Sequence, residues 1–371
     1  MRRRKFVGIA GGTILVAAGT YYLCSDKSNF TRNDIKTDAS NASRLLPDEV
    51  QILYLASLAP SGHNTQPWFV QYVEPYHWII GNDKSKWLPA VDPTQRETIL
   101  SIGAFLQTLE YAAGSLGYAC QFNLLATTNQ AQHIAEVTLS KAGNATGYEI
   151  QKIKRRRTVR SHYLNDVLTK ADQDYLIREA SNFFQYIPNT AKEHSWLNEQ
   201  TIEANRVQSY RDAAQKELAD WIRFSSKDAE RYADGLTTGS MEITGVPAWV
   251  LRNYYGKADV MKNGFREQSI DKVRDQVAKS AGWLLITGNG DSVGTLLETG
   301  KRMQRLFLKV RERSIAIHPM TQILEEPATN QQLNASIGIA DTVQFILRIG
   351  YVKNYPEPVS LRRPVERFIR T

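Results

Sequence analysis

The sequence predicts an α+β fold made of two similar units in one chain. Segments with helical periodicity and segments with strand character both occur in each half of the chain, so each half is predicted to be an α+β unit. The chain has 371 residues, of which 42% are hydrophobic, and this length suits two domains or one unit of double size. The boundary between the two units is predicted near residue 150.

The N-terminus is predicted to be a targeting segment. Basic residues at positions 2–5 precede an uncharged run over residues 6–25, which is just long enough to span a bilayer. Arg3-Arg4-Lys5-Phe6-Val7 matches the twin-arginine pattern of proteins that export machinery moves across the membrane already folded, and a plain membrane anchor is the alternative. We therefore expect a signal or anchor over residues 1–25, a polar linker over residues 26–45, and a periplasmic or otherwise extracytoplasmic location.

Charge and cysteine content restrict the class of partner. The formal net charge is +8, and beyond the N-terminus the basic excess is concentrated at residues 152–160 and 362–370. Such compact clusters suit a small polyanion, and the lack of interleaved aromatic residues argues against a nucleic-acid partner. The two cysteines and six scattered histidines show no ligand spacing, so no metal site is predicted.

The first unit, residues 46–150, is predicted to open with a helix and two strands. Apolar residues at helical spacing indicate a helix over residues 48–58, and Pro60 cannot extend it. Residues 68–73 and 76–80 have the composition of two strands joined by a short turn.

A second helix of this unit is predicted to start at Asp92, with Asp92 as its N-cap and Pro93 in its first turn. Gly117 is predicted to end it. Strands are expected at residues 120–126 and 136–140. The buried face of the helix is predicted to comprise Ile99, Ile102, Phe105, Leu106, Leu109, Ala113 and Leu116.

The second unit is predicted over residues 151–371. Its one clear strand is at residues 283–287. Residues 232–265 mix glycines with aromatic side chains, and this segment is either a lid over the functional site or an extra packing element. Helices are predicted at residues 170–183, 196–224, 296–311 and 333–347.

Residues 56–68, Ala-Ser-Leu-Ala-Pro-Ser-Gly-His-Asn-Thr-Gln-Pro-Trp, are the most informative stretch. They place short polar side chains just past a helix end, where they can match the N–H and the acceptors on the pyrimidine edge of a flavin ring. The stretch resembles the flavin-contacting loop of the nitroreductase superfamily. The cofactor-binding residues that this resemblance implies here are Pro60, Ser61, His63, Asn64 and Gln66.

Residues 82–119, 294–327 and 347–368 resemble one branch of that superfamily, the Acg-type FMN-binding oxidoreductases. The resemblance implies a nitroreductase-like fold in which the two units of one chain form an internal pseudo-dimer, where single-unit nitroreductases form homodimers. The expected protein is therefore a monomer. No second copy of the loop is visible, because the stretch near residues 184–190 is degenerate, so one FMN per chain is expected.

The FMN phosphate requires forked guanidinium donors and a hydroxyl. Arg156, Thr158 and Arg160 match the superfamily's Arg-x-Ser-x-Arg/Lys phosphate motif, with Arg157 pointing away; a solvated basic turn is the alternative. Near the C-terminus, Arg362 and then Arg363 resemble the phosphate arginine that precedes a proline, although Ser360 stands where the family has a lysine.

The far face of the flavin is expected to contact Met320, Thr321 and Gln322. His318 is a further candidate, with an ordinary loop histidine as the equal alternative. Gly288-Asn289-Gly290 lacks the spacing and the acidic residue of a dinucleotide fingerprint, so FMN is expected and not FAD.

The resulting hypothesis is an FMN-dependent, nitroreductase-like oxidoreductase that passes two electrons from a small-molecule donor to a small acceptor. A flavin performs such chemistry itself, so no catalytic side chain is assigned. The alternative is a protein that binds or sequesters FMN without turnover.

Overall fold

The computed structural model describes residues 26, 30–35, 44–143, 147–178 and 180–370. The predicted leader over residues 1–25 lies outside this part of the chain, and so does most of the predicted linker. Within the described residues, no helix has both the length and the apolar character needed to cross a bilayer.

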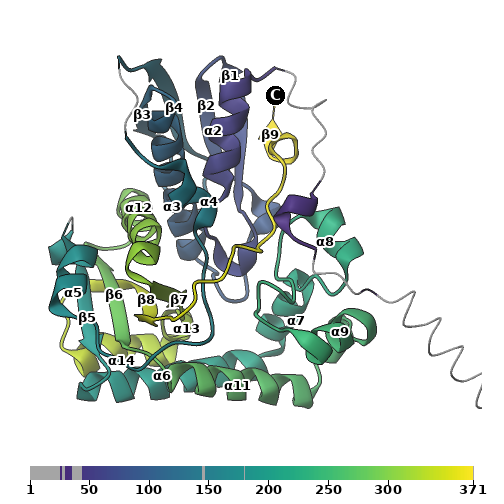
Figure 1. Ribbon diagram of the computed structural model, residues 1–371, viewed down its shortest axis with the longest axis vertical. Coiled ribbons are helices and arrows are strands. Elements are labelled where there is room, and N and C mark those ends of the chain that lie inside the picture. The colour runs from purple at the N-terminus through teal and green to yellow at the C-terminus, as the bar shows by residue number, and fades with distance from the viewer. Residues whose placement is uncertain (1–25, 27–29, 36–43, 144–146, 179, 371) are drawn as a thin grey trace, which may run out of the picture.

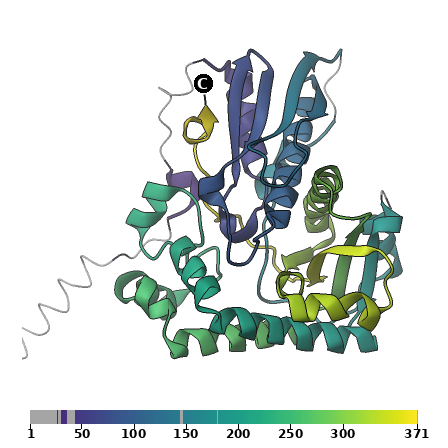
Figure 2. The same ribbon diagram turned by 180° about the vertical axis from the view of Figure 1, so that it is seen from behind.

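Two separate β-sheets organise the described structure (Figures 1 and 2). The first has the strand order β3-β4-β2-β1-β9, and every pair in it is antiparallel except β1 with β9. The second has the order β5-β6-β8-β7 and is antiparallel throughout. The strands are β1 (Trp68–Glu74), β2 (His77–Asn82), β3 (Tyr118–Leu124), β4 (His133–Lys141), β5 (Phe184–Pro188), β6 (Gly282–Gly288), β7 (Ile315–Pro319), β8 (Thr342–Tyr351) and β9 (Ile369–Arg370).

The α-helices are α2 (Pro47–Ser57), α3 (Arg96–Ser115), α4 (Ile150–Arg155), α5 (Lys170–Ile177), α6 (Lys192–Tyr210), α7 (Asp212–Trp221), α8 (Ser226–Tyr232), α9 (Gly245–Tyr254), α10 (Lys257–Val260), α11 (Asn263–Val277), α12 (Val293–Lys309), α13 (Gln322–Glu325) and α14 (Pro327–Ile337). Helices α6 and α11 lie side by side along the base of the molecule, next to α14, and α7 to α9 gather at one side (Figure 1).

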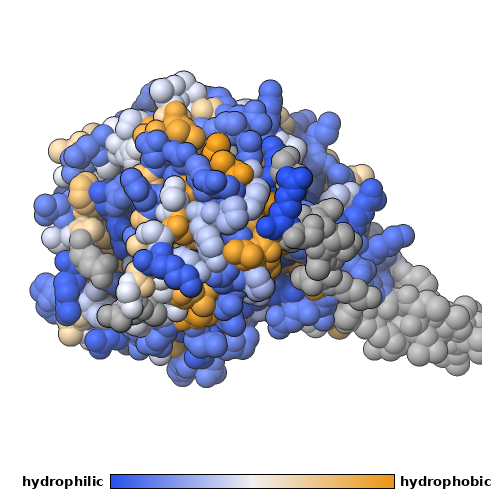
Figure 3. All heavy atoms as spheres, turned by 90° about the horizontal axis from the view of Figure 1, so that it is seen from above, coloured by the Kyte–Doolittle hydropathy of each residue, from blue (hydrophilic) through white to orange (hydrophobic). Residues whose placement is uncertain are grey.

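The main apolar core extends from the first sheet, across α3 and α12, to one face of the second sheet, where Leu284 and Phe345 lie. A second core on the opposite face of that sheet joins Leu285 to Leu197 of α6 and Leu333 of α14. Consecutive residues of β6 therefore enter different cores, as the alternation of side chains along a strand requires. The surface seen from above is mostly hydrophilic, with hydrophobic residues interspersed (Figure 3).

Helices α3 and α12 cross at very short range in the middle of the main core. A Cβ atom on Gly103 would lie 2.2 Å from the carbonyl oxygen of Leu297, and one on Gly300 would lie 2.0 Å from the carbonyl oxygen of Leu100. A glycine of each helix thus packs directly against the backbone of the other helix. Only glycine permits this approach.

The two sheets repeat one topology. Strands β1 and β2, helix α3, and strands β3 and β4 produce the order β1-β2-β4-β3, and β5 and β6, α12, and β7 and β8 produce the order β5-β6-β8-β7. Helices α6 to α11 form a long insertion between β5 and β6. The C-terminal strand β9 leaves the second half of the chain and pairs with β1 of the first sheet.

The prediction of a helix over residues 333–347 is wrong. Helix α14 ends at Ile337, where Gly338 adopts φ +70°, and the chain then enters strand β8. The apolar run that follows is buried on both faces between β6 and β7, and such a run has no period that separates strand from helix. Its β-branched residues were the available indication of a strand.

Two smaller predictions also need correction. The helix predicted over residues 170–183 stops at Ile177, before strand β5. The predicted helix over residues 196–224 is two helices, α6 and α7, because Arg211 leaves helical geometry between them.

The N-terminus of α3 differs from the predicted cap. The helix starts at Arg96 after Gln95, which has φ +59°. Asp92 lies one turn earlier, and its Oδ2 accepts hydrogen bonds from the backbone N–H and the hydroxyl of Thr98 at 2.9 and 3.2 Å. Asp92 therefore satisfies helix donors from outside the helix, a geometry that the spacing alone does not specify.

Candidate functional site

The loop that follows α2 has an unusual backbone. His63, Asn64 and Gln66 all have positive φ angles, of 46°, 56° and 55°, although none is glycine. Non-glycine residues in this conformation are strained and are retained where their surroundings hold them. In this protein, contacts from distant parts of the chain hold the loop in that shape.

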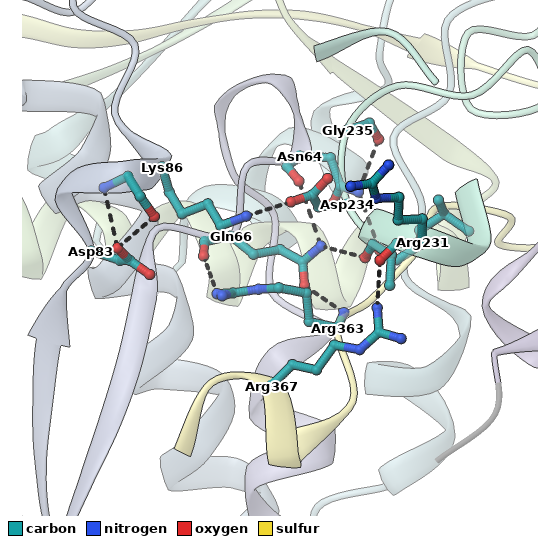
Figure 4. Close-up of polar contacts among 12 residues, drawn as sticks. Asn64, Gln66, Asp83, Lys86, Arg231, Asp234, Gly235, Arg363 and Arg367 are labelled. Carbon is teal, nitrogen blue, oxygen red and sulfur yellow. Dashed lines mark hydrogen bonds and ion pairs between the residues drawn. The ribbon is translucent and has the colours of Figure 1, made fainter. Parts of the chain in front are cut away.

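Those contacts come from the side chains of Asn64 and Gln66. The Nδ2 of Asn64 donates to the carbonyls of Gly235 and Leu361, both at 3.1 Å. The Nε2 of Gln66 donates to the carbonyl of Ala233 at 3.1 Å, and its Oε1 accepts from the backbone N–H of Arg363 at 2.8 Å. Figure 4 shows Asn64 and Gln66 close to Gly235 and Arg363. Both amides therefore hold the loop in shape, and Ser61 Oγ adds a hydrogen bond that it accepts from the backbone N–H of Gln66 at 2.9 Å.

Asp234 anchors the same region from the opposite side. Its carboxylate is fully buried and lies 2.7 Å from Lys86 Nζ and 2.5 Å from Arg223 Nη2 (Figure 4 shows the lysine). The neighbouring Gly235 exchanges backbone and side-chain hydrogen bonds with Asn64. The start of the segment 232–265 is thus held in place against the loop by these ion pairs and hydrogen bonds.

Two of the predicted phosphate arginines meet at the C-terminal end of α2. Arg156 donates from Nε and Nη2 to the carbonyl of Leu58, both at 3.2 Å, and Arg362 donates to the carbonyls of Leu58 and Ala59 at 3.1 and 3.0 Å. Cations at this end of a helix also interact favourably with the negative end of the helix dipole. Arg362 further donates to Asn64 Oδ1 at 2.8 Å, so the pair fixes the loop.

These two guanidinium groups are buried close to one another. Burial, and then the charge of neighbouring arginines, lowers the pKa of Arg156 to about 10 and that of Arg362 well below its ordinary value. Within the described part of the chain, Arg156 Nη1 and Arg362 Nε have no hydrogen-bond partner. Buried cationic donors in this state fit an anionic group such as a phosphate. Arg363 differs, because its Nη2 donates to the carbonyls of Gln66 and Trp68 and it supports the loop.

Arg160 links the loop of the first unit to the second unit. Its Nη1 donates to the carbonyl of Ser240 at 2.9 Å. Burial, with the charge of Arg160 as the second cause, lowers the pKa of His63 to about 4. Burial, followed by the charges of Arg348 and Arg160, also holds the pKa of His318 well below its ordinary value. Arg160 therefore lies within electrostatic range of both histidines, and both are neutral at pH 7.

The other residues of the basic motif have different environments. Arg157 forms an ion pair with Glu242 at 3.2 Å, consistent with its predicted exclusion from the phosphate motif. Thr158 is half-buried.

In the segment around the end of β7, one predicted site residue packs in the core and others keep polar atoms that are free within the described part of the chain. Met320 is 1% exposed and belongs to the second apolar core, so its side chain packs and does not face a ligand. His318 Nδ1 and Gln322 Oε1 are buried without a partner among the described residues. Thr321 donates from its hydroxyl to Glu325 Oε1 at 2.8 Å.

An acidic group next to the loop, whose side chain is only 15% exposed, was not predicted. Glu97 Oε1 accepts from Arg96 Nη2 at 3.0 Å, and a Cβ on Gly62 would lie 3.8 Å from its Oε2. Burial, and then the charge of Glu325, raises the pKa of Glu97 to about 8, and the charge of Arg96 opposes this shift. Glu97 thus joins the loop to the segment after β7. Acidic residues are common in the first turn of a helix, so nothing in the sequence distinguished Glu97 as a site residue.

The raised pKa of Glu97 predicts a pH-dependent stability. Between about pH 4.5 and pH 8 the folded protein keeps a proton on Glu97 that the unfolded chain releases. The free energy of unfolding should therefore fall as the pH rises through this window, and Glu97→Gln should remove much of the decline. Urea unfolding at pH 5, 7 and 9 measures this effect. Equal slopes for the parent protein and the variant would contradict it.

Among the described residues, no group of three or more His, Cys, Asp or Glu side chains could hold a metal ion.

Comparison with known proteins finds relatives over most of the chain. "Putative NAD(P)H nitroreductase acg" from Mycobacterium tuberculosis is 25% identical over 330 residues, which are 84% of this chain and 92% of that protein. "Probable NAD(P)H nitroreductase PigM" from Serratia sp. is 20% identical over 336 residues, 85% of this chain and 91% of that protein. A solved structure described as a "putative nitroreductase" from Anabaena variabilis aligns with a TM-score of 0.40 and 12% identity, over 86% of this chain and 90% of the other. No family model matches.

Proposed function

We propose that this protein is an FMN-dependent, nitroreductase-like oxidoreductase that passes two electrons from a nicotinamide donor to a small acceptor. The observation that carries the proposal is the meeting of the strained loop of the first unit with the segment after β7 of the second unit, around Arg160 and Glu97. The names of the sequence relatives support a nicotinamide donor and a redox reaction.

The residues of the site fit FMN. Arg156, Thr158, Arg160 and Arg362 would hold the phosphate, and Ser61 and His63 would lie along the ring with the loop backbone. His318 and Gln322, which keep unpartnered polar atoms among the described residues, would contact the other face. When bound, FMN supplies the electron transfer; the chain orients it, excludes water and keeps both histidines neutral. Asn64, Gln66, Arg362 and Arg363 contribute by holding the loop.

We infer further that the two units form an internal pseudo-dimer. The repeated strand order, the reciprocal glycine contacts between α3 and α12, and the pairing of C-terminal strand β9 with the first sheet all support this arrangement. In the second unit, β5 follows a short 3₁₀-helix, Ser181–Phe183, with no counterpart of the loop sequence. One FMN per chain is therefore proposed, in a monomer that the leader exports or anchors at the cytoplasmic membrane.

Purified protein is expected to be yellow, with a flavin absorption spectrum. Heating should release FMN and not FAD, because the site has a single mononucleotide-sized phosphate grip. Chromatography of the released flavin checks this. A colourless protein that also fails to take up added FMN would end the proposal.

Replacing Arg160 with alanine should weaken FMN binding by roughly 1.5–3 kcal/mol, the contribution of a charge-assisted hydrogen bond to a partly buried phosphate. Titration of the apoprotein with FMN, followed by quenching of flavin fluorescence, measures the change. Lys154→Ala is the matched control, because Lys154 is in the same basic segment but outside the motif. Equal losses from the two changes would indicate a diffuse electrostatic patch.

One observation favours storage of FMN without turnover. Ala233 and Gly235 pack directly on the loop, and Ser240 of the same segment accepts a hydrogen bond from Arg160, so this segment would restrict access to the ring. Anaerobic stopped-flow reduction by NADPH separates the two functions: rapid reduction supports the oxidoreductase, and failure with every donor and acceptor supports storage.

A further inference from the structure

A pocket of about 470 Å³ lies outside the loop site, between α4, the C-terminal end of α12 and the segment after β8. This volume is in the range of small-molecule sites. Its lining combines five basic side chains with two acidic ones and with apolar groups. The lining residues are Glu149, Gln151, Lys152, Arg155, Arg156, Phe307, Leu308, Arg311, Glu312, Lys353, Asn354 and Tyr355.

The acidic residues neutralise only part of this charge. Lys152 forms an ion pair with Glu312, and Arg311 forms one with Glu357 at 2.6 Å. Arg155, which is 55% exposed, lies 3.9 Å from Glu357, at the limit of an ion pair. Arg156 and Lys353 have no carboxylate partner in the described part of the chain. The pocket therefore retains a positive potential.

Arg156 places a buried cation at the wall of the pocket. The residue is 8% exposed, and its Nε and Nη2 are held by the carbonyl of Leu58. Its charge adds to the positive potential of the pocket, which attracts an anionic ligand.

Aromatic side chains complete the chemistry. The guanidinium of Arg156 lies 5.5 Å from the ring of Phe307, and that of Arg311 lies 4.8 Å from the ring of Tyr355. A half-buried tyrosine beside forked cations suits a ligand that carries both a phosphate and a planar base. A phosphorylated nucleotide has this combination.

The pocket is distinct from the proposed flavin grip. Thr158, Arg160 and Arg362 do not line it, and Arg156 is shared because it touches the end of α2 on one side and the pocket on the other. We propose that this pocket binds the phosphorylated nucleotide end of the electron donor, as a second nucleotide site beside the flavin. The identity of the donor rests on the proposed function; the site itself rests on the pocket.

Isothermal titration of the full-length protein as purified, with 2′,5′-ADP, AMP and inorganic phosphate as probes, tests the site. The variant Arg155→Glu/Lys353→Glu reverses two exposed charges of the pocket. Lys154→Glu is the control, since it makes the same change on the same helix outside the lining. We expect 2′,5′-ADP to bind, to weaken at least tenfold in the double variant, and to change less than about twofold in the control. Flavin content and the melting temperature should stay the same in both.

Four outcomes would overturn the site or its assignment, and a fifth would contradict only the proposed function. If no nucleotide probe binds, the proposed site does not exist. If the control variant loses as much affinity for 2′,5′-ADP as the double variant, the binding reflects a diffuse surface charge. If inorganic phosphate binds as tightly as 2′,5′-ADP, the pocket recognises a phosphate group and not a nucleotide. Loss of flavin together with nucleotide binding would make the pocket part of the flavin site. A protein that lacks flavin but binds 2′,5′-ADP would instead contradict the proposed function and leave this site intact.

Discussion

Replacing Gly300 with alanine is expected to destabilise the protein by about 3 kcal/mol or more. The added Cβ would lie 2.0 Å from the carbonyl oxygen of Leu100, in a backbone contact that no side-chain rotation can relieve. Overpacking of a core usually costs roughly 1–3 kcal/mol, and a backbone clash between two central helices is at the upper end of that range.

Gly294, on the same helix, is the matched control. Its added Cβ would meet only Leu124, at 3.6 Å, which is ordinary van der Waals contact. Because alanine is the better helix former, Gly294→Ala should leave the free energy of unfolding unchanged or raise it by up to about 1 kcal/mol. Urea unfolding measures both variants. A similar small effect of both would show that α3 and α12 can separate, and would weaken the pseudo-dimer proposal that rests on their crossing.

Removal of the Asp234 carboxylate is the second change with a large expected effect. Asp234→Ala would leave Arg223, which is 7% exposed, and Lys86, which is 20% exposed, without their shared partner. Breaking a buried ion pair from one side costs roughly 3–5 kcal/mol, because the remaining charge stays desolvated.

The control for this change is Asp220→Ala on α7. Asp220 pairs with Lys257 where both side chains are about half exposed or more, so its loss should cost less than about 1 kcal/mol. Urea unfolding again supplies the comparison. The Asp234 variant should also bind FMN more weakly, because Gly235 holds Asn64 in the loop. Normal stability with weak FMN binding would contradict the anchoring role.

Local patterns predicted the elements whose signals lie within a few residues. Helix α2, strands β1 and β2, the end of α3 at Gly117, and strands β3, β4 and β6 all follow from periodicity and turn residues, and they occur close to the predicted positions. The pattern failed at residues 333–347, because an apolar run buried on both faces carries no period.

The sequence by itself determined which residues gather in the loop and in the basic motif, since both are short motifs with fixed spacing. Tertiary structure decided what each of them does. Asn64 and Gln66 became supports because Gly235, Leu361 and Arg363, far away in the chain, supply their partners. Glu97 became a proton-holding group because its surroundings leave its side chain only 15% exposed and place Glu325 beside it. A side chain's partners and its exposure to water depend on residues hundreds of positions away, and local spacing carries no record of them.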